Sequence, residues 1–173
     1  MLLRDLFEKL HLSNSDVIPI ALQKLLREPL DVYADWKRTE QLLLDAKAML
    51  PGKLEVPVAL YKMYAYSNQF EKATATINEV LAEAAAQGGF PDNWRTLNTD
   101  SANWDNASGV IRAYLYTLKA SGFVCLRQGN IALAIEVLEK LRELDPLDQV
   151  GGSMIYEIAE RLLETEEKQS QHV

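Results

Sequence analysis

The sequence contains few of the side chains on which metal sites and nucleophilic catalysis depend. Its 173 residues include one cysteine, Cys125, and only two histidines, His11 and His172. One cysteine cannot form an intrachain disulfide, and the two histidines stand at no spacing typical of a zinc site or a Cys-His pair. Glycine-rich phosphate-binding patterns are absent as well. We therefore expect no metal, no cofactor and no catalytic residue.

Long runs of one residue type are also absent. No window approaches the roughly 20 uninterrupted apolar residues that a membrane-spanning helix needs. Residues 1–8 carry charges every third or fourth position, unlike a secretion signal. The net charge of -7 repels phosphate backbones, and no run of Lys or Arg forms a basic stripe. These absences predict a cytoplasmic protein that binds neither membranes nor nucleic acid.

What is present is the composition of a folded helical chain. Hydrophobic residues make up 48% and charged residues 25%, which separates the chain from disordered proteins, and its length suits one domain. Apolar residues recur at helical spacing almost throughout, whereas strict alternation is absent. Gly, Pro and capping residues divide the chain into about eight helices. One of these is expected to start at a cap formed by Ser15 or Asp16 and to end at Pro29.

One apolar pattern occurs three times. The first two copies stand 34 residues apart, and they read Trp36, Thr39, Leu43, Ala46, Pro51 and Phe70, Ala73, Ile77, Val80, Ala85. The third copy keeps the internal spacing but comes 27 residues later than the same period predicts, and it reads Ile131, Ala134, Leu138, Leu141, Pro146. A period of 34 residues is that of the two-helix tetratricopeptide unit.

The third copy with its preceding helix resembles a nearly complete tetratricopeptide motif. Small residues at Gly122 and Ala134 allow the paired helices to approach closely, Gly129 makes the sharp turn, and Pro146 ends the second helix. The resemblance to the tetratricopeptide-repeat family covers about half of the chain, at residues 115–148, 54–85 and, for one helix only, 34–51. It implies an all-α, right-handed array of antiparallel helix pairs.

The segments outside the repeats complete the expected domain, which spans residues 1–167. Pro29 interrupts the helix that would precede the first copy, so residues 1–30 are interpreted as a degenerate or capping unit. Residues 86–114 form an insertion, in which two helices continue past their usual ends into a hairpin with an irregular tip. Residues 149–167 form an amphipathic capping helix, and residues 168–173 a flexible tail.

The resemblance implies that an extended peptide binds along the concave face formed by the first helices of the repeats. Aromatic and cationic side chains expected on that face suit an acidic segment or a terminal carboxylate. Alternatively, the aromatic side chains pack against the terminal helices. Val58 and Ala120 stand where the carboxylate-clamp subfamily carries polar residues, so no strict clamp is expected. The candidate groove residues are Lys62, Tyr66, Tyr116, Lys119, Phe123 and Arg127.

The tip of the insertion offers a second candidate surface. Its aromatic residues Phe90, Trp94 and Trp104 either anchor a partner or fold the loop back onto the helices. Acidic and amide residues nearby, at positions 100, 103 and 105, lack the spacing, the Gly and the terminal Glu of a calcium loop. We therefore expect no calcium site there.

Together these patterns predict a protein-protein interaction module of the adaptor or chaperone-like kind, without catalysis. Two alternatives stay open. The chain is a structural homodimer that associates through the apolar stripe of residues 34–50 or of the terminal helix, or it is an accessory or regulatory subunit of an enzyme complex.

Overall fold

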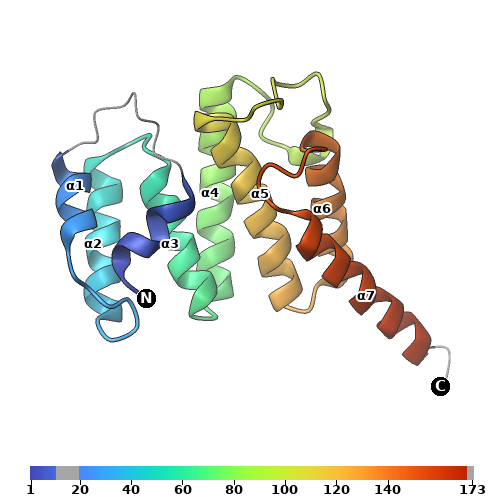
Figure 1. The fold of residues 1–173 in the computed structure, drawn as a ribbon, viewed down its shortest axis with the longest axis horizontal. Helices are drawn as coiled ribbons and strands as arrows, with labels where there is room; N and C mark the ends of the chain where they lie inside the picture. Colours follow the sequence, from blue (N-terminus) through green and yellow to red (C-terminus); the bar gives the residue numbers. More distant parts are fainter. Residues whose placement is uncertain (11–19, 171–173) are drawn as a thin grey trace. The chain divides into compact units, whose positions relative to one another are not determined.

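The computed structural model describes residues 1–10 and 20–170 (Figure 1). Within these residues the chain forms seven α-helices, two 3₁₀ helices and no strand, apart from an isolated bridge between Leu2 and Asp31. The predicted all-α class is confirmed. The predicted cap at Ser15 and Asp16 lies outside the described residues, and the predicted number of about eight helices is not confirmed. None of the described helices is long and apolar enough to cross a membrane.

The chain divides into two compact units, Met1–Glu83 and Ala84–Val173. The boundary falls inside one long helix, α4 (Phe70–Gly88). The sequence-based expectation of a single domain over residues 1–167 stays a prediction.

The first unit is built around the second and third helices. The 3₁₀ helix η1 packs against α3 and α1, and α2 packs against both α1 and α3. Side chains that are almost fully buried, including Leu6, Leu43 and Met63, form its core. Its elements are η1 (Leu3–Leu10), α1 (Ile20–Arg27), α2 (Trp36–Met49), α3 (Glu55–Tyr66) and the first part of α4.

Polar contacts tie the first part of α4 to α2 and α3. Lys72 on α4 forms an ion pair with Glu40 on α2 at 2.8 Å, and the Tyr64 hydroxyl on α3 donates to the same carboxylate at 2.8 Å. The hydrogen bond from Lys72 lowers the pKa of Glu40, although partial burial opposes it. A second ion pair joins Lys47 on α2 to Glu79 on α4.

The second unit contains an antiparallel helix pair, α5 (Gly109–Arg127) and α6 (Ile131–Leu144), followed by α7 (Ser153–Ser170). The helices α5 and α6 lie side by side in Figure 1, and α7 packs against α6. The turn between α5 and α6 uses Gly129 at a φ of 78°, and the Asn130 side chain caps α6 by accepting from the Leu133 amide at 3.3 Å. The predicted turn at Gly129 is confirmed.

Gly122, which has no side chain, allows α5 and α6 to pack closely. A Cβ atom at Gly122 would lie 2.6 Å from Cγ of Leu138 on α6, well inside van der Waals contact. Ala134, one turn earlier on α6, is fully buried. The sequence predicted close approach of the helices at these small residues, and the contact at Gly122 confirms it.

Two aspartates shape the turn from α6 to α7. The buried Asp145 carboxylate accepts from the amides of Gln149 and Val150, each at 3.0 Å. Asp148 accepts from the Gly152 and Ser153 amides at the start of α7, at 2.6 and 3.0 Å. Partial burial alone would raise the pKa of Asp148, but the hydrogen bonds from Ser153 and Gly152 lower it. The turn that begins before Pro146 therefore fixes the direction of α7.

The close contact at Gly122 gives a stability test. We expect Gly122→Ala to lower the free energy of unfolding by about 1–2 kcal/mol, because displacement of Leu138 costs more than the gain in helix propensity. Urea unfolding followed by circular dichroism measures the change. Ala132→Leu, which adds a larger side chain at an exposed position of α6, serves as the control and should stay within about 0.5 kcal/mol of wild type. A Gly122→Ala variant as stable as wild type would contradict the close packing of the pair.

Candidate functional site

The connection between α4 and α5, residues 89–108 in the second unit, is folded back by buried aromatic side chains. Phe90 is 7% exposed and Trp104 4% exposed. Their ring centroids lie 5.3 Å apart, and those of Phe90 and Tyr114 on α5 lie 4.9 Å apart in an edge-to-face arrangement. The sequence left two interpretations for Phe90 and Trp104, as anchors for a partner or as rings that fold the loop back onto the helices. Both rings are buried against the helices, which is the second interpretation.

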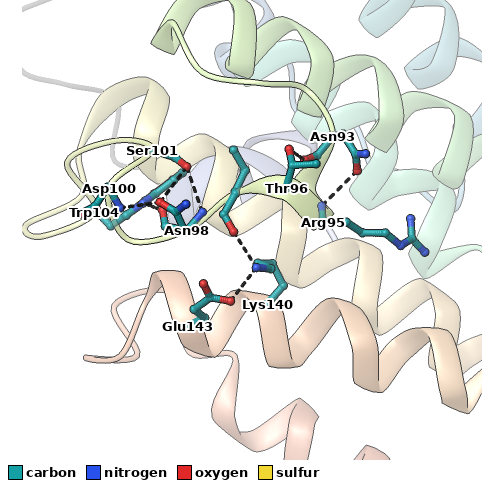
Figure 2. A network of polar contacts seen from close by, with 10 residues as sticks. Asn93, Arg95, Thr96, Asn98, Asp100, Ser101, Trp104, Lys140 and Glu143 are labelled. Atoms are coloured by element: carbon teal, nitrogen blue, oxygen red, sulfur yellow. Dashed lines mark hydrogen bonds and ion pairs between the residues drawn. The ribbon is translucent and has the colours of Figure 1, made fainter.

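Hydrogen bonds within the loop hold its outer part in one conformation. The indole Nε1 of Trp104 donates to the Asn98 carbonyl at 2.9 Å. The Asn98 side chain accepts from the Asp100 amide at 2.9 Å, and the Ser101 hydroxyl accepts from the Asn98 amide at 3.0 Å. Figure 2 shows these residues converging beside the Trp104 ring. Outside a helix, backbone N–H and C=O groups need other hydrogen-bond partners. Short-range contacts of this kind provide them.

A lysine on α6 fastens the loop to the helix pair. The ammonium of Lys140 donates to the carbonyl of Leu97 and to the carboxylate of Glu143, both at 2.6 Å (Figure 2). Leu97 itself is only 1% exposed, so its side chain is part of the packed interior. Since hydrogen bonds from a charged donor are stronger than neutral ones, this contact is a strong polar link from α6 to the loop backbone.

A glutamine in the α6–α7 turn makes a second connection. The side-chain amide of Gln149 donates to the Trp104 carbonyl at 3.0 Å, and its oxygen accepts from the Ala107 amide at 2.7 Å. Asp145 in turn accepts from the same side-chain amide at 3.0 Å. The loop is therefore held from two sides, by α6 and by the turn that follows it.

The outer surface of the loop presents a tryptophan and an arginine. Trp94 begins the 3₁₀ helix η2 (Trp94–Thr96), which Asn93 caps by accepting from the Arg95 amide at 3.2 Å. Trp94 is half-buried, and the Arg95 guanidinium lies 4.2 Å from the centre of its ring. Arg95 also binds Glu136 on α6 through two hydrogen bonds, of 2.6 and 3.1 Å. These bonds lower the pKa of the Glu136 carboxyl.

Tyr114 marks the inner end of this aromatic cluster. The side chain is fully buried, and its hydroxyl has no hydrogen-bond partner among the described residues. Burial, together with the negative charge of Asp92, raises the pKa of Tyr114. The phenol therefore stays neutral at physiological pH and serves as part of the packing.

The groove residues expected from the first unit differ in their surroundings. Tyr66, at the end of α3, is 46% exposed. Lys62 is only 6% exposed, and its ammonium donates to the Leu6 carbonyl at 2.6 Å. The expectation that Lys62 offers its charge to a partner does not fit this environment. The 3₁₀ helix η1 packs over α3, and its Leu6 carbonyl already accepts from the Lys62 ammonium.

The groove residues expected from the second unit all lie on α5. Tyr116 is 8% exposed, and Lys119, whose ammonium lies 4.5 Å from the Tyr116 ring, donates to the Val150 carbonyl at 2.5 Å. The α6–α7 turn thus already uses the charge of Lys119. Further along α5, Arg127 is exposed and its guanidinium lies 5.8 Å from the centre of the half-buried Phe123 ring.

The described residues offer no cluster for metal or thiol chemistry. No group of three or more His, Cys, Asp or Glu side chains gathers into a possible metal site in residues 1–10 and 20–170. Cys125 is buried in the helix pair, and burial raises the pKa of its thiol. The sequence predicted a core position for Cys125, and the burial of its side chain confirms that prediction.

No sequence pattern pointed to the residues that position the loop. Glu136, Lys140 and Gln149 make their contacts with residues 41 to 45 positions away. In the sequence these polar residues resemble ordinary solvated positions of a helix or a turn, and only their contacts with the folded loop show their role. The aromatic composition of the insertion was the one signal that pointed to this site.

Comparisons with known proteins identify a relative whose own role is not described. No family model matches the chain, and no solved structure matches it significantly. The chain is similar to an uncharacterized 19.8 kDa protein in the nifW 5′ region of Azotobacter chroococcum mcd 1, with 29% identity over 121 residues that cover 69% of this chain and 68% of that protein. The tetratricopeptide resemblance stays a prediction.

The contact of Lys140 with the loop is testable without disturbing the core. We expect Lys140→Met, which keeps an apolar stem of similar length, to lower the free energy of unfolding by about 1–3 kcal/mol, because the Leu97 carbonyl loses its charged donor. The variant should also be cleaved faster by protease within residues 93–104. Lys53→Met on the first unit is the matched control. Equal cleavage rates for Lys140→Met and wild type would show that the contact does not hold the loop.

Proposed function

We propose that this chain is a tetratricopeptide-type protein-binding module that recognises a partner protein through the outer surface of its α4–α5 loop. The observation that carries the proposal is the Trp94–Arg95 pair. A large, half-buried aromatic ring lies against a guanidinium, and the backbone of the loop is fixed by a contact with α6.

The chemistry of this pair supports a protein partner. Trp and Arg are enriched among the few residues that supply most of the energy of protein interfaces. A ring held on a fixed loop loses little conformational freedom on binding, so more of the contact energy appears as affinity. Arg95 keeps its orientation through two bonds to Glu136, so the cation and the adjacent Trp94 ring are held in a fixed arrangement.

The tetratricopeptide part of the proposal is supported by the α5–α6 pair. Gly122 against Leu138, the left-handed Gly129 and the end of α6 before Pro146 stand where the repeat motif needs them. Arg127 and Phe123, which the resemblance assigns to the face where that family binds peptides, are a cation and an aromatic ring close to each other. We propose this end of α5 as a secondary contact for an acidic segment of the partner.

We also propose a second role, as an accessory subunit of an enzyme complex, and the gene position of a relative bears on its test. The relative from Azotobacter chroococcum mcd 1 carries a name that places its gene in the nifW 5′ region. Genes that stand together commonly encode proteins that act together. We propose that the partner is encoded near the gene of this chain, and co-purification from a native host examines this directly.

The loop proposal predicts which single change removes the partner. We expect Trp94→Ala to abolish capture of the partner from native lysate, or to weaken binding of the purified partner by at least about tenfold, as loss of an interface anchor does. Trp36→Ala is the matched control, because Trp36 is also a half-buried tryptophan and lies on α2. Mass spectrometry of the captured proteins and titration calorimetry provide the measurements.

The remaining outcomes separate the two contact surfaces. Loss of the partner with Arg127→Glu but not with Trp94→Ala would move the site to α5 and contradict the loop proposal. Retention of every partner by both variants would contradict both surfaces.

A further inference from the structure

The last helix of the chain carries an apolar stripe that its own unit does not cover. Met154, Ile158 and Leu162 on α7 are 71%, 45% and 41% exposed. Residues four apart lie on one face of a helix, so the three side chains form a continuous row. We call this row the α7 stripe. Contiguous exposed apolar rows of this kind mark interaction surfaces in folded proteins.

The α7 stripe is distinct from the face that packs against the rest of the second unit. Tyr156 and Ala159 are buried, and Tyr156 donates to Glu139 on α6 at 3.4 Å. Figure 1 shows the C-terminal part of α7 extending away from α5 and α6. The helix is therefore anchored along one face while the stripe on its neighbouring face stays open to a second molecule.

A pair of opposite charges runs along one edge of the stripe. Glu157 directly precedes Ile158, and Arg161 directly precedes Leu162. Their side chains form an exposed ion pair at 3.6 Å. Because exposed pairs of this type contribute little to the stability of the helix, both groups can exchange this contact for one with another molecule at small cost.

The order of these charges favours a second copy of the chain over other occupants. When two α7 helices pack antiparallel with their stripes in contact, Glu157 of one copy comes next to Arg161 of the other. By symmetry, Arg161 of the first copy comes next to Glu157 of the second. A segment of uniform charge would instead place a like charge against Glu157 or Arg161. A bilayer surface fits poorly, since α7 has five glutamates and only two basic residues.

We propose that the α7 stripe forms an antiparallel, two-fold symmetric helix pair with the same stripe of a second copy. A symmetric interface uses one patch twice, so each residue contact occurs in duplicate. The stripe from Met154 to Leu162 spans only about 12 Å of helix, which places the interface at the small end of specific interfaces. The dimer is therefore reversible, with a dissociation constant on the order of micromolar. This inference is independent of the proposed loop site, which uses none of these residues.

Sedimentation equilibrium over a concentration series tests the association. The wild-type mass should rise from 19.5 kDa toward twice that value across the micromolar range. Ile158→Asp should weaken association by more than about tenfold, because two copies of the change place charges in the apolar centre. Leu147→Asp, at a residue 73% exposed outside α7, is the matched control and should dimerise as wild type does.

Charge exchange tests the antiparallel arrangement at exposed positions that the fold does not need. Glu157→Arg alone and Arg161→Glu alone should each be monomeric where wild type is dimeric, since each places like charges across the pair. Mixing the two variants should restore a dimer that contains one copy of each, because both arginines of the first variant then face glutamates of the second. The ion pair within each helix stays broken in the mixture, so recovery reports only the contact between copies.

Any of the following results would overturn the proposal. The first is a wild-type chain that stays at 19.5 kDa throughout the series. The second is a dimer that survives Ile158→Asp, or whose charge variants fail to recover on mixing, since its interface would then lie elsewhere or run in another orientation. The third is association of wild type with a basic helical peptide in place of itself, which would contradict the assignment to a second copy.

Discussion

The arrangement of the second unit depends on the close contact between Gly122 on α5 and Leu138 on α6. With no side chain at Gly122, Leu138 lies directly against the backbone of α5. This spacing fixes the surface of α6, and the same helix provides Lys140 and Glu136 to the loop and Glu139 to α7. A shift of α6 by the width of one methyl group would move all three contacts together, because packed interiors transmit displacement instead of absorbing it.

Local structure was predicted well at residues whose type favours one backbone conformation. The turn at Gly129 and the continuation of two helices into the insertion were predicted, because glycine and helical periodicity carry that information directly. The surroundings of Lys62 were not predicted. Its burial under η1 depends on how a degenerate N-terminal segment packs, and no periodic pattern reports that packing.

The candidate site was predicted only in part for the same reason. Three aromatic residues in a long insertion indicated a site, yet the sequence could not separate the buried Phe90 and Trp104 from the half-buried Trp94. That difference comes from the contacts of Lys140 and Gln149, which join positions more than 40 residues apart. Two buried rings and two polar connections thus hold the loop in one conformation, and the proposed binding role of Trp94 depends on that rigidity.

The central claim is that the α4–α5 loop is a fixed element and not a flexible connection, and amide hydrogen exchange of the wild-type chain tests it most directly. The amides of Thr96, Leu97, Asn98, Asp100 and Ser101 all donate hydrogen bonds within the loop. If the loop is fixed, these amides exchange far more slowly than an unstructured chain does. Exchange of residues 95–101 at the unstructured rate, while α5 and α6 stay protected, would contradict the account.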